Sequence, residues 1–114
     1  MTAYGDNAEQ IVALNGKVTQ AIWRTQRLDA DSPEARQAFA VVSGIEEELA
    51  SLLPYDCVEG VVARIGAVTA SIDADDLPRA KSLIERYLVG APEDVAEELA
   101  QLAKEVSALT TRTG

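Results

Sequence analysis

Apolar residues between positions 56 and 72 recur at alternating steps of three and four, which is the spacing of one face of an α-helix. The members of this stripe are Val58, Val61, Ile65, Val68 and Ile72. A second stripe consists of very small residues, namely Gly60, Ala63, Ala67 and Ala70. Because small side chains let another backbone approach closely, the two stripes predict a central helix over residues 56–72 that is covered on more than one side.

The same segment is rich in β-branched residues, which are also favoured in strands. No second strand is predicted elsewhere in the chain, so a strand here would have no partner to pair with. We therefore favour a helix, with Asp56 as its N-cap and Glu59 three residues later in the manner of a capping box.

Four further segments have helical periodicity, at residues 7–29, 33–53, 78–89 and 92–109. Asp6 is the expected N-cap of the first, and Ser32 followed by Pro33 is a start signal for the second. Gly90 is expected just past the end of the 78–89 segment, where a left-handed backbone conformation favours glycine. The run Glu46–Glu48 is expected mainly on the solvated side of the second helix.

The connections between these segments are short, which favours antiparallel neighbours. We predict an all-α fold, a compact bundle of about five helices with the 56–72 helix at its centre. The 114 residues are expected to form a single helical domain, 1–114, in which residues 1–5 and 110–114 are loose.

The formal net charge of −9 argues against binding to nucleic acid, because the phosphate backbone attracts clustered Lys and Arg. Cys57 is the single cysteine, so no intrachain disulfide can form, and a reducing, cytoplasmic location is expected. No signal-peptide pattern is visible, and no apolar run approaches the length needed to cross a bilayer. We expect neither nucleic-acid nor membrane partners.

Catalytic chemistry has few candidates, because histidine is absent and with it the commonest general base. Cys57 at a helix start is either a small hydrophobe or a redox-active thiol. Asp73, Asp75 and Asp76 could bind a hard cation such as Mg²⁺, although they do not follow the calcium-loop pattern. We predict no catalytic residue, no metal ligand and no cofactor.

One alternative is a magnesium-dependent all-α nucleotide pyrophosphohydrolase. Enzymes of that kind hold the metal with paired acidic motifs, Glu-x-x-Glu and Glu-x-x-Asp, on facing helices. The run Glu46–Glu48 and the pair Asp94-x-x-Glu97 match this pattern only in part, because the first motif is missing. Helix capping and a solvated acidic face explain these residues better.

The stronger functional signal is Trp23, which lies off the main apolar stripe of the first helix. Trp and Arg are enriched among the residues that dominate the binding energy of protein interfaces. The predicted interface residues are Val12, Gly16, Thr19, Trp23 and Arg27. The alternative is that the fifth helix or the C-terminal tail covers Trp23 within the chain.

These observations favour a non-catalytic helical protein–protein interaction module that associates with a second copy of itself. Such a module could act as a regulator, an adaptor or a small companion subunit of a larger effector. Besides the hydrolase, a further alternative is an acidic decoy that inhibits a basic nucleic-acid-binding partner.

Overall fold

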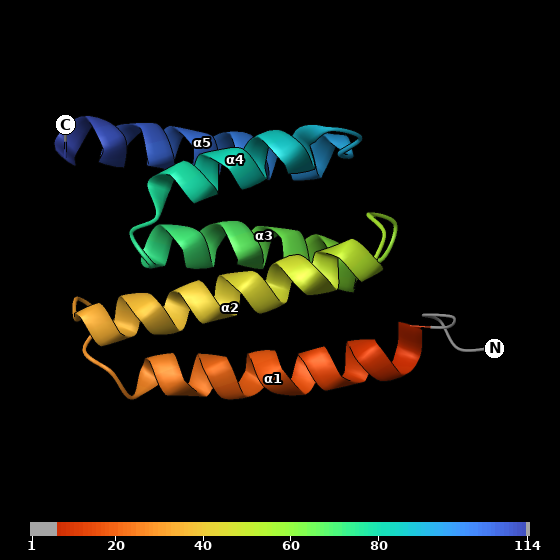
Figure 1. Cartoon of the computed structure of the whole chain (residues 1–114). Coiled ribbons are helices and arrows are strands. Elements are labelled where there is room, and N and C mark those ends of the chain that lie inside the picture. Colours follow the sequence, from red (N-terminus) through yellow and green to blue (C-terminus); the bar gives the residue numbers. More distant parts are fainter. Residues whose placement is uncertain (1–6, 114) are drawn as a thin grey trace.

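The computed structural model describes residues 7–113, and that part of the chain forms five α-helices without a strand (Figure 1). The helices are α1 (Ala8–Gln26), α2 (Pro33–Leu52), α3 (Val58–Asp73), α4 (Leu77–Leu88) and α5 (Glu93–Thr113). Neighbouring helices run antiparallel. The predicted all-α class is therefore confirmed, and the alternative of a strand at residues 56–72 is wrong.

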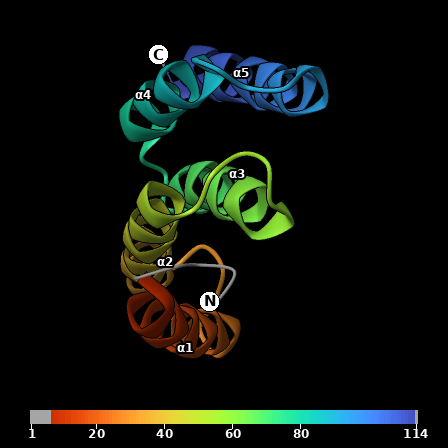
Figure 2. The same ribbon diagram turned by 90° about the vertical axis from the view of Figure 1, so that its right-hand side faces the viewer.

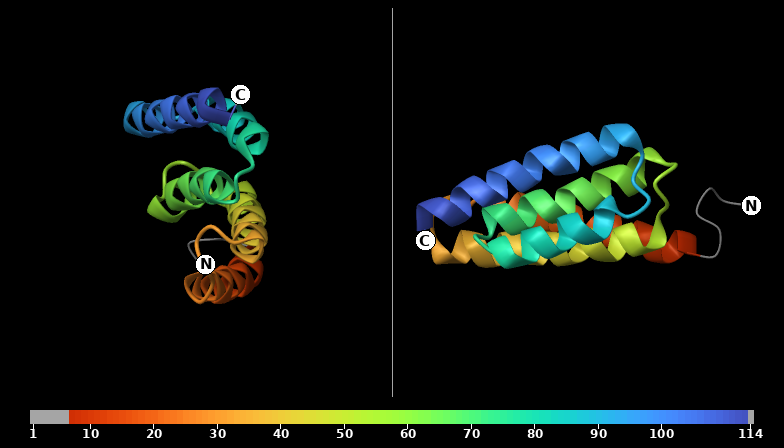
Figure 3. Two further views of the ribbon diagram at one scale, coloured as in Figure 1. Left: turned by 90° about the vertical axis from the view of Figure 1, so that its left-hand side faces the viewer. Right: turned by 90° about the horizontal axis from the view of Figure 1, so that it is seen from above.

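The helices stack in chain order from α1 at one end to α4 and α5 at the other (Figure 1). Seen along the helices, α2 and α4 lie to one side of the stack and α3 and α5 to the other (Figure 2; Figure 3, left). α3 packs against α2, α4 and α5, whereas the main partner of α1 is α2. The predicted central position of α3 is thus confirmed.

The buried side of α3 is built mainly from its small residues, with Val68 as the one fully buried member of its large apolar stripe. Ala67 is completely buried, and the other small residues of its stripe are buried as well. Val58, by contrast, belongs to the large apolar stripe and is 78% exposed. Val68 is the fully buried member of that stripe, while Val61, Ile65 and Ile72 are partly buried at its edge.

A close approach of the α2–α3 connection explains why a small residue opens this stripe. A Cβ atom on Gly60 would overlap the carbonyl oxygen of Pro54. The thiol of Cys57 joins the two, since its sulfur accepts a hydrogen bond from the Gly60 amide and donates one to the Pro54 carbonyl, both at 3.4 Å. Cys57 and not Asp56 is therefore the N-cap, and α3 begins two residues later than predicted.

The other helix ends follow the sequence signals closely. The Ser32 hydroxyl accepts a hydrogen bond from the Ala35 amide at 3.1 Å and caps α2 as predicted. Gly90 has a φ of 75°, which confirms its place just past the end of α4. The predicted Asp6 cap of α1 lies outside the described residues, and Asn7 precedes the helix without a side-chain cap.

The C-terminal helix extends further than the apolar periodicity indicated. α5 continues to Thr113, so residues 110–113, which we expected to be loose, belong to this helix. The hydroxyls of Thr110 and Thr111 donate hydrogen bonds to the carbonyls of Val106 and Ser107, four residues earlier. These bonds satisfy the hydroxyl groups of both side chains within the helix itself.

Candidate interaction surfaces

The outer side of α1 carries the five residues that the sequence predicted as an interface. We call this surface the α1 face and define it as Val12, Gly16, Thr19, Trp23 and Arg27. All five are exposed, Val12 by 67% and Trp23 by 58%. Neither α5 nor residues 110–113 cover Trp23, because α5 lies at the opposite end of the stack (Figure 2).

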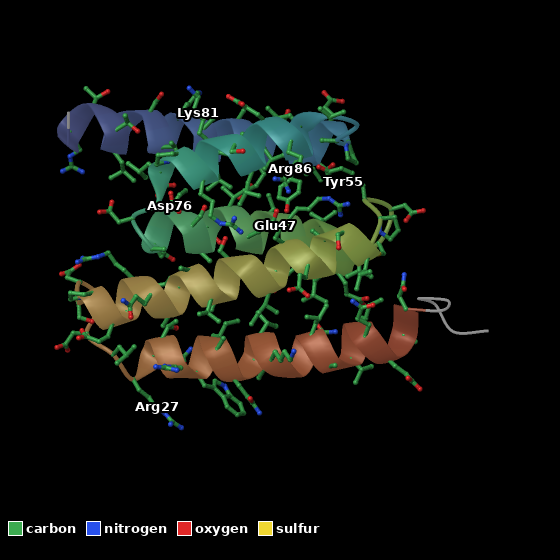
Figure 4. The ribbon with its side chains drawn as sticks, viewed as in Figure 1. Arg27, Glu47, Tyr55, Asp76, Lys81 and Arg86 are labelled. Carbon is green, nitrogen blue, oxygen red and sulfur yellow. The ribbon has the colours of Figure 1, made fainter. Side chains whose placement is uncertain are left out.

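Basic residues flank this apolar surface along one side. Lys17, Arg24 and Arg27 are all exposed, and none of them forms an ion pair with another residue of the described chain. The Arg27 side chain extends away from the stack at the end of α1 (Figure 4). The α1 face thus combines exposed apolar area with the positive charge of Arg27, and Lys17 and Arg24 beside it line a pocket between α1 and α2 together with Glu34.

A groove runs over α3 between α2 and α5, and we call it the α3 groove. Its volume is about 570 Å³. Its residues are Glu46 from α2, then Val61, Val62, Ile65, Gly66 and Thr69 from α3, and Asp94, Val95 and Glu98 from α5. The floor is therefore mainly apolar, three carboxylates stand around it, and no basic residue lines it.

Glu46 reaches this groove because α3 has a glycine beside it. A Cβ atom on Gly66 would overlap the Glu46 carboxylate. Burial in this position disfavours the charged form and raises the pKa of Glu46 from 4.5 to about 7. The prediction that the run Glu46–Glu48 lies on the solvated side is wrong for this residue.

The acidic character extends along α5. Asp94, Glu98 and Glu105 are separated by four and seven residues, which places them on one side of the helix. Burial, and then the nearby negative charge of Glu105, raise the pKa of Asp73 at the end of α3. Negative charge therefore continues from the groove toward the far end of the α3–α5 pair.

Glu47 lies on the other side of α2 and ties this helix to α4 (Figure 4). Its two carboxylate oxygens accept hydrogen bonds from Arg79 at 2.8 Å and from Arg86 at 2.5 Å. Hydrogen bonds from Arg86 first, and then from Arg79, lower the pKa of Glu47. The prediction of a solvated position is wrong for Glu47 also, whereas Glu48 is exposed as expected.

A buried hydroxyl continues this network into α3. Arg79 Nε donates to Ser43 Oγ at 3.1 Å, and Ser43 donates to the Ala67 carbonyl at 2.8 Å. Ser43 is completely buried, and both of these partners satisfy it. The network therefore connects α2, α3 and α4 at the point where α3 is most deeply packed.

Two tyrosines complete the contact between the α2–α3 connection and α4. The Arg64 guanidinium lies 4.1 Å from the centre of the Tyr55 ring and 5.8 Å from that of Tyr87. The Tyr55 hydroxyl donates a hydrogen bond to the Tyr87 carbonyl. The cluster has no nucleophile next to a general base, and its contacts serve to hold helices together.

Of the remaining candidate carboxylates, Asp76 has a structural partner and Glu97 lies apart from the α3 groove. The Asp76 carboxylate accepts a hydrogen bond from the Arg79 amide at 3.2 Å and caps α4. Glu97 is exposed on α5, apart from the α3 groove that Asp94 lines. Among the described residues, no three acidic or thiol side chains are grouped so that they could hold a metal ion.

Comparison with protein-family models, with curated proteins and with solved structures found no match to this chain. Within residues 7–113, no helix combines the length and the apolar character needed to cross a membrane. Function must therefore be argued from the two surfaces described above.

Proposed function

We propose that this protein is a non-catalytic helical interaction module that associates with a second copy of itself through the α1 face. The observation that carries the proposal is the position of Trp23. The Trp23 side chain is 58% exposed, and it lies on α1, whose main packing partner is α2. A module of this kind would act as a regulator, an adaptor or a small companion subunit of a larger effector.

The composition of the α1 face supports this role. An exposed indole is a large amphipathic surface that loses little conformational entropy on binding, and Trp and Arg are the residues most enriched in interface hot spots. Gly16 adds a flat position on the same side of α1, about two turns before Trp23, because nothing lies within 4 Å of where its Cβ would be. A second helix can therefore approach the α1 backbone closely at this point.

The acidic residues favour an interaction module over a magnesium-dependent hydrolase. Glu47, which a metal would need, is already held by two guanidinium groups. Asp76 caps α4, and Glu97 does not line the groove beside Asp94. The carboxylates thus have structural partners or lie apart, whereas the α1 face has no partner within residues 7–113.

Sedimentation velocity over a concentration series tests the proposal. The wild-type protein is expected to associate as concentration rises, with a blue shift of Trp23 fluorescence as the indole leaves water. Trp23→Ala is expected to weaken association at least tenfold, because hot-spot truncations cost about 2 kcal/mol or more. Its free energy of unfolding as a monomer should change by less than about 0.5 kcal/mol, as for other exposed positions.

Val89→Ala is the matched control, since Val89 is an exposed apolar residue in the loop between α4 and α5. This variant should associate like the wild type. A wild-type protein that stays monomeric at all concentrations, with Trp23 emission typical of a solvated indole, would refute the proposal.

A further inference from the structure

We infer that self-association is head to tail: the α1 face of one copy occupies the α3 groove of the next. This inference rests on the proposed function and specifies which surface the α1 face binds. Three properties of the two surfaces carry it, namely their charge, their apolar content and their length.

The charges of the two surfaces are opposite. Residues 8–27 contain three basic residues, Lys17, Arg24 and Arg27, against one acidic residue, Glu9, so this segment is positive in a chain of net charge −9. The α3 groove has acidic residues on both of its walls and no basic residue in its lining. The part of the chain that is positive and exposed therefore matches a groove whose negative charge near pH 7 comes mainly from Asp94 and Glu98, because the raised pKa of Glu46 leaves its carboxyl group partly protonated.

The apolar surfaces are also complementary. Val62 on the groove floor is 58% exposed, and Val58 continues the floor by one turn toward the start of α3. Val12 and Trp23 on the α1 face are exposed to a similar extent. Bringing the two surfaces together would remove from water four large apolar side chains that the fold leaves in contact with it.

The lengths of the two surfaces agree. Val12 and Trp23 are separated by eleven residues along α1, as Val58 and Thr69 are along α3. At 1.5 Å per residue, each pair spans about 16 Å. A helix with the α1 spacing can therefore lie along the floor of the groove, with the apolar Val58 near one end and Thr69 at the other.

Pairing of two α1 faces with each other is the less favourable arrangement. The five residues of the α1 face include Arg27 and no acidic residue, so a symmetric pair of these faces would provide no carboxylate of the face to compensate it. In the head-to-tail arrangement, Arg27 and the neighbouring Arg24 approach the groove that Asp94 and Glu98 line. Such a contact uses two different surfaces, so each copy keeps one surface free for a further copy.

Mixing two defective variants distinguishes these arrangements. Trp23→Ala/Arg27→Ala disables the α1 face without introducing negative charge, and it leaves the groove intact. Val62→Lys/Glu98→Lys disables the groove and leaves the α1 face intact. Each variant alone should associate at least about 30-fold more weakly than the wild type, as expected for loss of interface hot spots.

The equimolar mixture should regain association as a 1:1 heterodimer with an affinity close to that of one wild-type contact. It should not grow further, because the remaining α1 face and the remaining groove are both disabled. Sedimentation velocity and light scattering measure this, and circular dichroism confirms that each variant is folded. Glu85→Lys, at an exposed position on α4, is the control for a change of net charge and should associate like the wild type.

The outcomes separate the inference from the proposed function. If the wild type associates but the mixture stays monomeric, the head-to-tail inference is wrong, and so is a symmetric α1 pair, in which the groove variant would associate with itself. If the groove variant alone associates like the wild type, the α3 groove is not the occupied surface, the inference fails and a symmetric α1 pair is supported. If the wild type does not associate at any concentration, both proposals fall.

Discussion

α1 and α3 are both apolar helices with a glycine on one face, yet they bury opposite kinds of residue. α1 has one main neighbour and buries a stripe of large side chains, with Ile11, Leu14 and Val18 in contact with α2. α3 has three neighbours and buries its small residues most deeply. The comparison shows that close approach of several helices selects small side chains, and that large apolar residues are then displaced to the edge or to solvent.

One glycine on each helix shows the same difference in packing between α3 and α1. Gly60 on α3 lies against the Pro54 carbonyl, whereas nothing lies within 4 Å of a Cβ built on Gly16 of α1. A helical glycine costs about 1 kcal/mol relative to alanine, so only the first has a steric reason in the fold of this chain.

The largest expected effect is that of Gly60→Ala. The added methyl group would meet backbone, which cannot move aside as a flexible side chain can, and overpacking of this kind costs about 1–3 kcal/mol. We expect the free energy of unfolding to fall by about 2 kcal/mol in urea denaturation, despite the better helix propensity of alanine.

Gly16→Ala is the matched control for this substitution. It should raise the free energy of unfolding by about 0.5–1 kcal/mol, because the site is open and alanine is the better helix former. If both alanine variants were stabilised, the close approach at Gly60 would be wrong, and with it the reason given for the small residues of α3.

An intermediate effect on the free energy of unfolding is expected from Glu46, whose carboxylate packs against Gly66 of α3. Its pKa is raised from 4.5 to about 7, so the folded protein binds a proton that the unfolded chain releases. The contribution of this residue is therefore most favourable below about pH 4.5 and is lost as pH rises toward 7 and above. After allowance for partial exposure to solvent, we expect a loss of about 1–2 kcal/mol.

Glu46→Gln removes this titration. The difference in free energy of unfolding between the variant and the wild type should grow in favour of the variant from pH 5 to pH 8. Glu48→Gln at an exposed position should show no such trend. The pKa of Glu47 is lowered, so its contribution changes at lower pH and does not confuse this comparison. A pH-independent difference would contradict the burial of the Glu46 carboxylate.

The smallest expected effect is at the end of α3. Asp75 has a φ of 60°, and its amide and that of Asp76 donate hydrogen bonds to the carbonyls of Ile72 and Ser71, both at 2.9 Å. This is a Schellman motif, in which glycine is the favoured residue at the position of Asp75. Asp75→Gly should therefore raise the melting temperature, with a gain of about 0.5–1 kcal/mol.

Asp29→Gly provides the comparison for that variant, because Asp29 is exposed in the α1–α2 connection without a positive φ. It should give no gain in stability, since glycine there only increases the freedom of the unfolded chain. Equal gains at both positions would show that the left-handed conformation of Asp75 is not the cause.

The sequence by itself determined the number of helices and most of their boundaries, whereas it left open whether Trp23 on α1 is covered by another part of the chain. These depend on periodicity and on local signals such as Ser32 before Pro33, or Gly90 after α4, which act within a few residues. The sequence did not reveal which stripe of α3 is buried, because hydrophobicity favours Val58 and Val62 over alanine, while close approach of neighbouring helices favours the reverse.

Only the tertiary structure decided what the carboxylates do. Glu46, Glu47 and Glu48 are adjacent in the chain and chemically alike. One lies over Gly66 in a groove, one is held by two arginines from α4 and one is exposed. Their partners are about 20 to 40 residues away, so no local pattern distinguishes them. The α3 groove likewise exists only where α2, α3 and α5 meet, because its walls come from segments that folding brings together.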